Sequence, residues 1–441
     1  MKIKVCDALC GAGKTVSCIN MMNRETDKRF IFITPYLTEV ERIKQCCSLR
    51  RFVSPEKKYA NGFSKLNDIH GLLTRGENIV STHSLFACYT DETKRLIREQ
   101  GYTLVLDEVI DVFQPLRING GDVDLLLRHN IAIHKDNEII WSDEDYSGVL
   151  FSEVKQMSKS KNLIMYGESF YFWAIPPDLF GCFSEAYVLT YLFEYQLLRY
   201  FFDANSLKYE LIGTRREGNS YDFCALNEMD RRVDLREKIH ILQSRKRNGV
   251  GRDPFSLSSG WFERNLLPGK SAVTELKNSI YNVFRYDFEG GSCERMWTAF
   301  NKTKKALRGK GYSSGFVAFN SRATNEFANK KYLAYCVNVF MQPWAKNYLL
   351  QHGITKISQD MYALSVLVQW LFRSAIRKGE DIWVYIPSKR MRELLDRWIE
   401  NLAAGDDLKE ISYSALNKPE KPRKLREAFE KMRSGKDRSV T

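Results

Sequence analysis

Apolar residues in the first half of the chain form short, nearly continuous runs separated by longer amphipathic stretches. The runs that predict strands are KIKVCDA at the start and residues 29–35, 77–83, 103–109 and 186–192. The stretches between them, such as LTEVERIKQCC and ETKRLIREQG, have the period of amphipathic helices. Strands that are apolar on both faces and alternate with helices are typical of a parallel sheet with right-handed crossovers. The pattern therefore predicts a doubly wound α/β lobe.

The pattern begins again near residue 205 and predicts a second α/β lobe. LKYELIG (207–213) has the pattern of an opening strand, and FVAFNS (316–321) and IWVYIP (382–387) have those of later strands. A long apolar helix is expected over 362–377. We therefore expect a first lobe over 1–205, a second lobe over 206–400 with an irregular insertion at about 220–300, and a basic, proline-marked tail over 401–441.

Composition and charge narrow the class of protein. The 441 residues are 44% hydrophobic and 27% charged, which is ordinary for a globular protein. Because there is no run of about 18 apolar residues and no signal-peptide pattern, we expect no membrane span and a cytoplasmic location. The net charge of +13 favours a polyanionic partner such as nucleic acid. Ten cysteines without a CxxC pair do not predict a zinc site.

A glycine-rich turn, ALCGAGKT, follows the first predicted strand and precedes a predicted helix. In that context, backbone N–H groups converge on a phosphate at the positive end of the helix. The Lys14 ammonium is then expected to contact the β- and γ-phosphates, and the Thr15 hydroxyl to bind Mg²⁺. The predicted cofactors are ATP and Mg²⁺, and the predicted nucleotide-binding residues are Ala8, Gly11, Ala12, Gly13, Lys14 and Thr15.

Two adjacent acids end the apolar run LVLDEV. A phosphate loop needs such acids at the end of a neighbouring strand, because phosphoryl transfer depends on positioning and charge neutralisation. We expect Asp107 to bind Mg²⁺ and Glu108 to orient and polarise the attacking water. The pair predicts hydrolysis of a nucleoside triphosphate.

These segments, taken together, resemble the motifs of helicase superfamily 2, in particular its phage-encoded DEAD/DEAH-box-like members. The matching segments are ALCGAGKT (8–15) for motif I, ITPYLTE (33–39) for Ia, VSTHSLF (80–86) for Ib, DEVI (107–110) for II, VLTYL (188–192) for III, VAFNSRATNEF (317–327) for V and QWLFRSAIR (369–377) for VI. They span nearly the whole chain except the tail. The resemblance implies two RecA-like lobes with ATP bound between them.

The resemblance also implies roles for particular residues in the second lobe and at the strand ends. Gln369, Arg373 and Arg377 would act on the nucleotide from the second lobe, and Thr190 would couple hydrolysis to movement. The implied nucleic-acid contacts are Thr34, Thr82, Asn320, Arg322, Thr324 and Asn325. Arg373 and Arg377 are four residues apart, a spacing that places both on one face of a helix.

Other interpretations remain open for several of these residues. The threonines could be helix caps, and the segment around Asn320 could be a polar turn. Residues 362–377 could be a plain core helix. Seven residues precede Ala8, too few for an upstream adenine-reading motif, so the base is open.

The sequence thus predicts an ATP hydrolase that works as a helicase or translocase on DNA or RNA, with DNA favoured over RNA. Replication or recombination proteins are candidate partners, and the expected setting is phage DNA replication, recombination or repair. The alternative is a nucleic-acid-binding P-loop ATPase that acts as a non-unwinding motor or switch.

Overall fold

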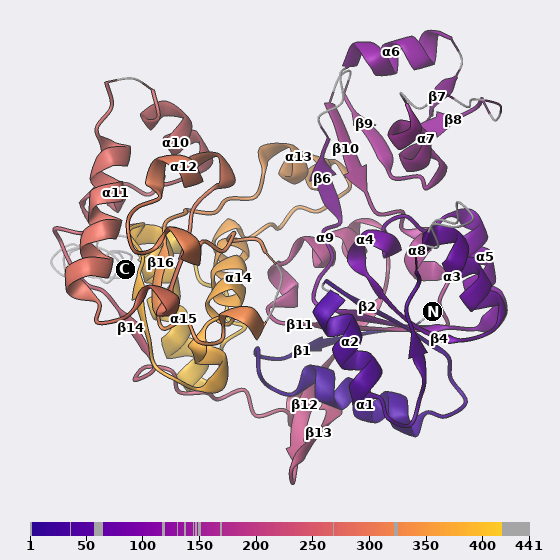
Figure 1. Ribbon diagram of the computed structural model, residues 1–441, viewed down its shortest axis with the longest axis horizontal. Helices are drawn as coiled ribbons and strands as arrows, with labels where there is room; N and C mark the ends of the chain where they lie inside the picture. Colours follow the sequence, from indigo (N-terminus) through magenta and orange to yellow (C-terminus); the bar gives the residue numbers. More distant parts are fainter. Residues whose placement is uncertain are drawn as a thin grey trace, which may run out of the picture.

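The computed structural model contains two α/β lobes and a smaller unit that projects from the first (Figure 1). It describes residues 2–35, 37–56, 65–116, 120–129, 131–135, 138–143, 145, 148, 151–167, 170–267, 269–321 and 325–416. Among these, no helix combines the length and the apolar character needed to cross a bilayer. The predicted fold class, α/β with two lobes built on parallel sheets, is confirmed.

The first lobe is built on an eight-stranded sheet with the strand order β13-β12-β1-β11-β5-β2-β4-β3. The strands are β1 (Lys2–Asp7), β2 (Phe30–Thr34), β3 (Phe52–Val53), β4 (Asn78–Thr82), β5 (Thr103–Asp107), β11 (Glu185–Thr190), β12 (Tyr209–Glu217) and β13 (Ser220–Ala225). Neighbouring strands are parallel except β12 and β13, which form an antiparallel hairpin.

Helices cover both faces of this sheet. They are α1 (Lys14–Arg24), α2 (Leu37–Cys46), α3 (Lys65–Thr74), α4 (His83–Phe86), α5 (Asp91–Gln100), α8 (Asp178–Gly181) and α9 (Leu197–Ala204). Along β2, Phe30 and Phe32 belong to the core cluster that contains residues of α1 and α2. Ile31 and Ile33 belong to the opposite cluster, with residues of α3, α5 and α9. The near-continuous apolar runs are therefore explained by burial on both faces.

Residues 207–213 belong to the first lobe, and their prediction as the opening strand of the second lobe is wrong. They contribute to β12, which pairs with β1 in parallel through Ile3 and Tyr209. A strand-like pattern predicts a strand but does not specify its partner. Here the free edge of β1 accepts the strand, so the first sheet continues to Ala225.

The projecting unit, which the sequence pattern did not predict, is an antiparallel five-stranded sheet with two helices. It consists of β6 (Phe113–Pro115), β7 (Ala132–Lys135), β8 (Glu138–Trp141), β9 (Leu163–Tyr166), β10 (Phe170–Ala174), α6 (Gly120–Arg128) and α7 (Ser152–Lys159). Strands β6 and β10 join it to the first lobe, with Phe113 paired to Ala174. The chain enters it only a few residues after Glu108.

The second lobe is built on a four-stranded parallel sheet with the order β14-β17-β16-β15. Its elements are β14 (Ile239–Ile241), α10 (Ser259–Asn265), α11 (Ala272–Asn282), β15 (Arg295–Thr298), α12 (Lys304–Leu307), β16 (Tyr332–Tyr335), α13 (Pro343–Gln351), α14 (Gln359–Leu371), β17 (Ile382–Tyr385), α15 (Lys389–Ala404) and α16 (Tyr413–Leu416). Residues 220–300 are therefore not an irregular insertion, because they include β14, β15 and the helices between them. Residues 316–321 form a single bridge, Phe316 to Trp297, rather than a strand.

Helix α13 comes from the second-lobe part of the sequence but packs against the projecting unit (Figure 1). The Trp344 ring lies 5.3 Å from that of Phe170 and 5.2 Å from that of Phe172. The Tyr348 ring lies 5.2 Å from that of Phe113. These rings cover the face of the small sheet opposite α6 and α7, so the two lobes share one apolar core at this point.

A buried ion pair of the second lobe also makes hydrogen bonds to the first lobe. The Arg231 guanidinium donates to both carboxylate oxygens of Asp407, at 2.7 and 2.8 Å, and to the Asp7 carbonyl at 2.8 Å. The Tyr191 hydroxyl donates to Asp407 at 2.6 Å. Asp407 is 2% exposed, so its charge depends on these partners. The pair fixes the end of the second lobe beside the end of β1.

Candidate active site between the lobes

The glycine-rich turn lies between β1 and α1, as the sequence predicted. The Ala8 amide donates to the Thr190 carbonyl at 3.1 Å, which continues the pairing of β1 with β11 into the turn. Gly11 and Gly13 have φ angles of +91° and +79°, in the region that favours glycine. Gly13 is the N-cap residue of α1, so the turn ends at the positive end of that helix.

Lys14 and Thr15 both point toward the turn and the neighbouring strand end. The Lys14 ammonium donates to the Ala8 carbonyl at 2.6 Å and to the Leu9 carbonyl at 3.1 Å, so its charge lies over the turn. The Thr15 hydroxyl lies 3.4 Å from a carboxylate oxygen of Asp107. A hydroxyl and a carboxylate are hard oxygen donors of the kind that Mg²⁺ prefers, so this pair fits the expected cation.

Asp107 and Glu108 lie at the end of β5, two strands from β1 in the sheet. Burial and, secondarily, the neighbouring Glu108 carboxylate raise the pKa of Asp107 to about 7. The His83 ring is buried and lies 3.1 Å from the Asp107 carbonyl. Glu108 has a φ of +64°, an uncommon conformation for a residue with a side chain. This turn redirects the chain immediately after the two acids.

A cavity of about 170 Å³ separates these residues from the second lobe. Its lining combines residues of the turn, the two acids and the predicted arginine segment: Cys10, Gly11, Gly13, Lys14, Thr15, Val16, Arg42, Asp107, Glu108, Gln369, Phe372, Arg373 and Arg377. The two sides nearly touch, because a Cβ on Gly11 would lie 3.6 Å from the Arg377 carbonyl oxygen. Acids from one lobe and guanidinium groups from the other therefore line the same cavity.

The arginines do not share one helical face, and the prediction of a continuous helix over 362–377 is wrong. Helix α14 ends at Leu371, and Arg377 lies in a separate 3₁₀ turn over Ala375–Lys378. The break occurs at Ser374, whose backbone is extended and whose hydroxyl donates to the Leu371 carbonyl at 2.6 Å. Ala375 and Ile376 are nevertheless buried, so the apolar pattern continues across the break. Arg373 and Arg377 reach the same cavity from this bend.

The remaining residues of the turn contribute through the backbone or lie nearby. The Ala12 carbonyl accepts a hydrogen bond from the Thr214 hydroxyl at 2.6 Å. Thr190 is buried and donates to the Gln196 side chain at 3.0 Å. Thr190 does not line the cavity, so a coupling role would act through Gln196 and through the backbone contact with Ala8.

The predicted nucleic-acid contacts are not gathered in one place. Thr34 is fully buried, which does not fit a surface contact. Thr82 lines a separate cavity of about 380 Å³ at the end of β4. Asn320 lines a third cavity, together with Glu108, Gln369 and Arg373. Arg322 and Thr324 lie outside the described residues, and Asn325 begins a 3₁₀ turn over Asn325–Phe327.

Sequence reasoning missed the contribution of α2 and of the β12–β13 hairpin. Arg42 reaches the cavity from α2 and pairs with Glu39. In the sequence, this spacing is that of an ordinary surface ion pair on a helix. The Tyr221 ring lies directly on Gly13, and the Tyr221 carbonyl accepts from the Asn20 amide at 2.9 Å. No sequence signal places this hairpin, because it depends on the pairing of β12 with β1.

Comparison with known proteins identifies two parts of the chain separately. Residues 113–173 match the YonV middle domain, and residues 233–399 match the YonV C-terminal Rossmann-like domain. The first match coincides with the projecting unit and the second with the second lobe.

Two individual proteins are similar along most of the chain. The S. tokodaii protein Xpd4 has a solved structure with a TM-score of 0.44 and 12% identity, over 90% of this chain and 94% of that one. So loose a likeness carries no argument about function. The SPbeta prophage-derived uncharacterized protein YonV of Bacillus subtilis (strain 168) is 40% identical over 416 residues, which cover 91% of this chain and 99% of that protein. The chain belongs to the YonV family.

Proposed function

We propose that this protein hydrolyses ATP in the cavity between its lobes and uses the hydrolysis to move along nucleic acid, as a helicase or translocase. The observation that carries the proposal is the lining of one cavity by Lys14, Thr15 and the two acids from the first lobe and by Arg373 and Arg377 from the second. A phosphate-binding turn alone could serve many reactions. Guanidinium groups supplied by another lobe favour a reaction whose rate depends on closure of the lobes.

Each group has a place in phosphoryl transfer. The Lys14 ammonium, which now contacts carbonyls of its own turn, would exchange them for phosphate oxygens. Thr15 and Asp107 would hold Mg²⁺, which neutralises phosphate charge when bound. The Glu108 carboxylate would accept a hydrogen bond from the attacking water and orient it. Arg373 and Arg377 would stabilise the charge that develops on the transferred phosphoryl group.

The second lobe contributes to the site only when the lobes are close together. Nucleotide contact with Arg373 and Arg377 would therefore favour the closed arrangement by the free energy of those contacts. Release of phosphate would remove that preference. A cycle of closing and opening could move a bound polyanion, and the net charge of +13 favours such a partner. The prophage origin of the YonV relative agrees with the expected phage setting.

The test is the rate of ATP hydrolysis by the full chain, measured alone and with single- or double-stranded DNA or RNA. Stimulation by one of these polymers is expected, and a strand-displacement assay then distinguishes unwinding from translocation. Lys14→Ala should abolish hydrolysis. The control Lys44→Ala removes a lysine that pairs with Glu41 on the surface, and it should leave hydrolysis unchanged. Undiminished hydrolysis by the Lys14→Ala variant would refute the site. Hydrolysis that no nucleic acid stimulates would favour the alternative of a non-unwinding switch.

A further inference from the structure

On the second lobe, an exposed phenylalanine stacks on a half-buried one that lies against a buried arginine. The Phe255 and Phe340 rings stack with centroids 5.9 Å apart and planes inclined by 28°. Phe255 is 62% exposed, although it belongs to a chain segment with buried neighbours such as Leu257. The Arg390 guanidinium lies 4.2 Å from the centroid of the Phe340 ring. The Phe255 ring therefore leaves apolar surface in water.

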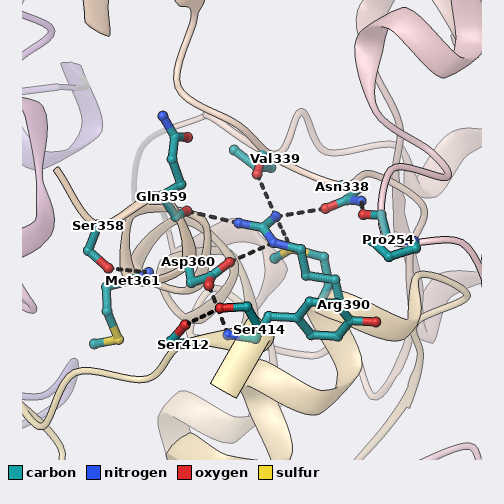
Figure 2. A network of polar contacts seen from close by, with 12 residues as sticks. Pro254, Asn338, Val339, Ser358, Gln359, Asp360, Met361, Arg390, Ser412 and Ser414 are labelled. Atoms are coloured by element: carbon teal, nitrogen blue, oxygen red, sulfur yellow. Dashed lines mark hydrogen bonds and ion pairs between the residues drawn. The ribbon is translucent and has the colours of Figure 1, made fainter. Parts of the chain in front are cut away.

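A polar network fixes both chain segments that carry the pair, and Figure 2 shows its contacts among Pro254, Asn338, Val339 and Arg390. The Asn338 amide donates to the carbonyls of Pro254 and Ser256, the residues on either side of Phe255, at 2.8 and 2.9 Å. Arg390 donates to the Asn338 side chain at 2.8 Å and to the carbonyl of Val339, the residue before Phe340, at 2.9 Å. The two rings therefore have fixed backbones, and little conformational entropy would be lost on binding.

The charge of Arg390 is neutralised inside the protein, so Arg390 adds no charge to the surface beside the rings. It is 2% exposed, pairs with Asp360 at 2.8 Å and donates to the Gln359 carbonyl at 2.9 Å. Burial of an arginine requires such compensation. The arrangement uses a buried ion pair to position the half-buried Phe340 ring, on which the exposed Phe255 ring stacks.

A cationic cavity is lined by residues that are close in sequence to the pair and to Arg390. It has a volume of about 360 Å³ and is lined by Gln243, Ser244, Arg245, Asn248, Arg252, Lys389 and Arg392. Arg252 precedes Phe255 by three residues, at most about 11 Å along the chain. Lys389 adjoins Arg390 at the start of α15. The aromatic pair and the cavity therefore lie within reach of one extended ligand.

The charge available in this cavity comes from its arginines. Lys389 is paired with Glu393 at 3.4 Å. Arg392 and Arg252 donate to the neutral carbonyls of Ile386 at 2.6 Å and Arg245 at 3.5 Å, which leaves their charge in place. In the part of the chain that the structure describes, no ion pair is found for Arg245 or Arg252. Their positive charge is therefore available to an anion.

We propose that Phe255, Phe340 and this cavity bind single-stranded nucleic acid, with a base stacked on the phenylalanine pair and a neighbouring phosphate beside Arg245 and Arg252. This inference rests on the proposed function, because it specifies the surface that the polyanion contacts. Phenylalanine offers a π face but no hydrogen bonds, so the contact is independent of base identity. A duplex keeps its bases stacked on each other, so the site favours a single strand.

The test is the binding of a fluorescein-labelled thymidine oligonucleotide of about 16 residues to the full chain, measured by fluorescence anisotropy. Phe255→Ala should weaken binding about 5- to 150-fold, the range for loss of one stacked base. Phe255→Trp should restore it, whereas Phe255→Leu, which keeps an apolar side chain without a π face, should not. Tyr286→Ala removes another exposed aromatic residue, which lies outside this site, and the variant should bind as the unaltered protein does.

Two further measurements separate stacking from charge. On an abasic strand of equal length, the Phe255→Ala variant and the unaltered protein should bind equally. Arg245→Ala and Arg252→Ala should each reduce the slope of log affinity against log salt by about one phosphate contact, and Phe255→Ala should not change it.

The outcomes distinguish this site from the proposed function. If the unaltered protein binds no oligonucleotide, the single-strand site is refuted, and the motor function is decided by the hydrolysis measurements with double-stranded DNA and with RNA. If it binds, and Phe255→Ala or Phe255→Leu binds equally well, the base-stacking site is refuted while the motor function stands. If Phe255→Ala lowers the affinity for the abasic strand as much as for the intact strand, stacking is also refuted. The substitution would then act through a change in structure.

Discussion

Replacement of Gly13 by alanine tests how closely the β12–β13 hairpin lies on the phosphate-binding turn. At a φ of +79°, an alanine costs about 1–2 kcal/mol relative to glycine. The added Cβ would also lie 2.2, 2.3 and 2.6 Å from three carbon atoms of the Tyr221 ring. Ordinary contacts between carbons are about 3.5–4.0 Å, so the ring must move by more than about 1 Å.

The cost of the backbone conformation and the cost of moving the Tyr221 ring can be separated with a second substitution. Displacement of a packed ring costs about 1–3 kcal/mol, so Gly13→Ala should lower the free energy of unfolding of the first lobe by about 2–5 kcal/mol. In a Tyr221→Ala background only the backbone term remains, and the cost of Gly13→Ala should fall to about 1–2 kcal/mol. Equilibrium urea unfolding of the four proteins, followed by circular dichroism, gives the coupling energy directly.

The result that would refute this reasoning is an equal cost of Gly13→Ala in both backgrounds. The hairpin would then not contact the turn in solution. A cost near zero in both would mean that Gly13 does not adopt its positive φ angle.

Three other substitutions have expected results that the structure specifies. Arg377→Ala should lower the rate of ATP hydrolysis about 10³-fold or more in single-turnover measurements, with little change in ATP affinity, and the adjacent Lys378→Ala should not; an equal rate would place Arg377 outside the site. Because the pKa of Asp107 is raised to about 7, its carboxylate is protonated at lower pH, and the proton competes with Mg²⁺ for the same oxygens. The apparent Mg²⁺ affinity should therefore fall about tenfold per pH unit below pH 7, and a pH-independent affinity between pH 5 and 7 would contradict the assignment of Asp107 as a ligand. Arg390→Ala leaves Asp360 without its buried partner and should lower the free energy of unfolding by about 3–5 kcal/mol in urea, against a small change for the exposed Arg397→Ala; similar values for the two would show that the network is not formed.

The parts of the site that depend on local sequence were predictable. The turn around Gly13 and Lys14 lies between a strand and a helix, and Asp107 ends a buried strand. Parallel strands bring their carboxyl ends to one edge of a sheet, so these two segments meet although they are far apart in the sequence.

The parts that depend on long-range pairing were not predictable. The strand pattern of residues 207–213 did not indicate that β12 would join the first sheet. The break after Leu371 was hidden because Ala375 and Ile376 return to the core and continue the apolar period. The small sheet of the projecting unit has strands of three to five residues, too short for a reliable period.

The position of α13 limits how the molecule can flex. This helix is covalently part of the second lobe, yet Trp344 and Tyr348 anchor it in the aromatic core of the projecting unit. When the lobes separate, a displacement that keeps that core intact strains the short connectors at 341–342 and 352–358 and the contacts of the Arg231–Asp407 pair with the first lobe. The projecting unit would then move with the first lobe. Two connectors of a few residues each join it to the second lobe, and their extended length sets an upper limit on how far the lobes can separate.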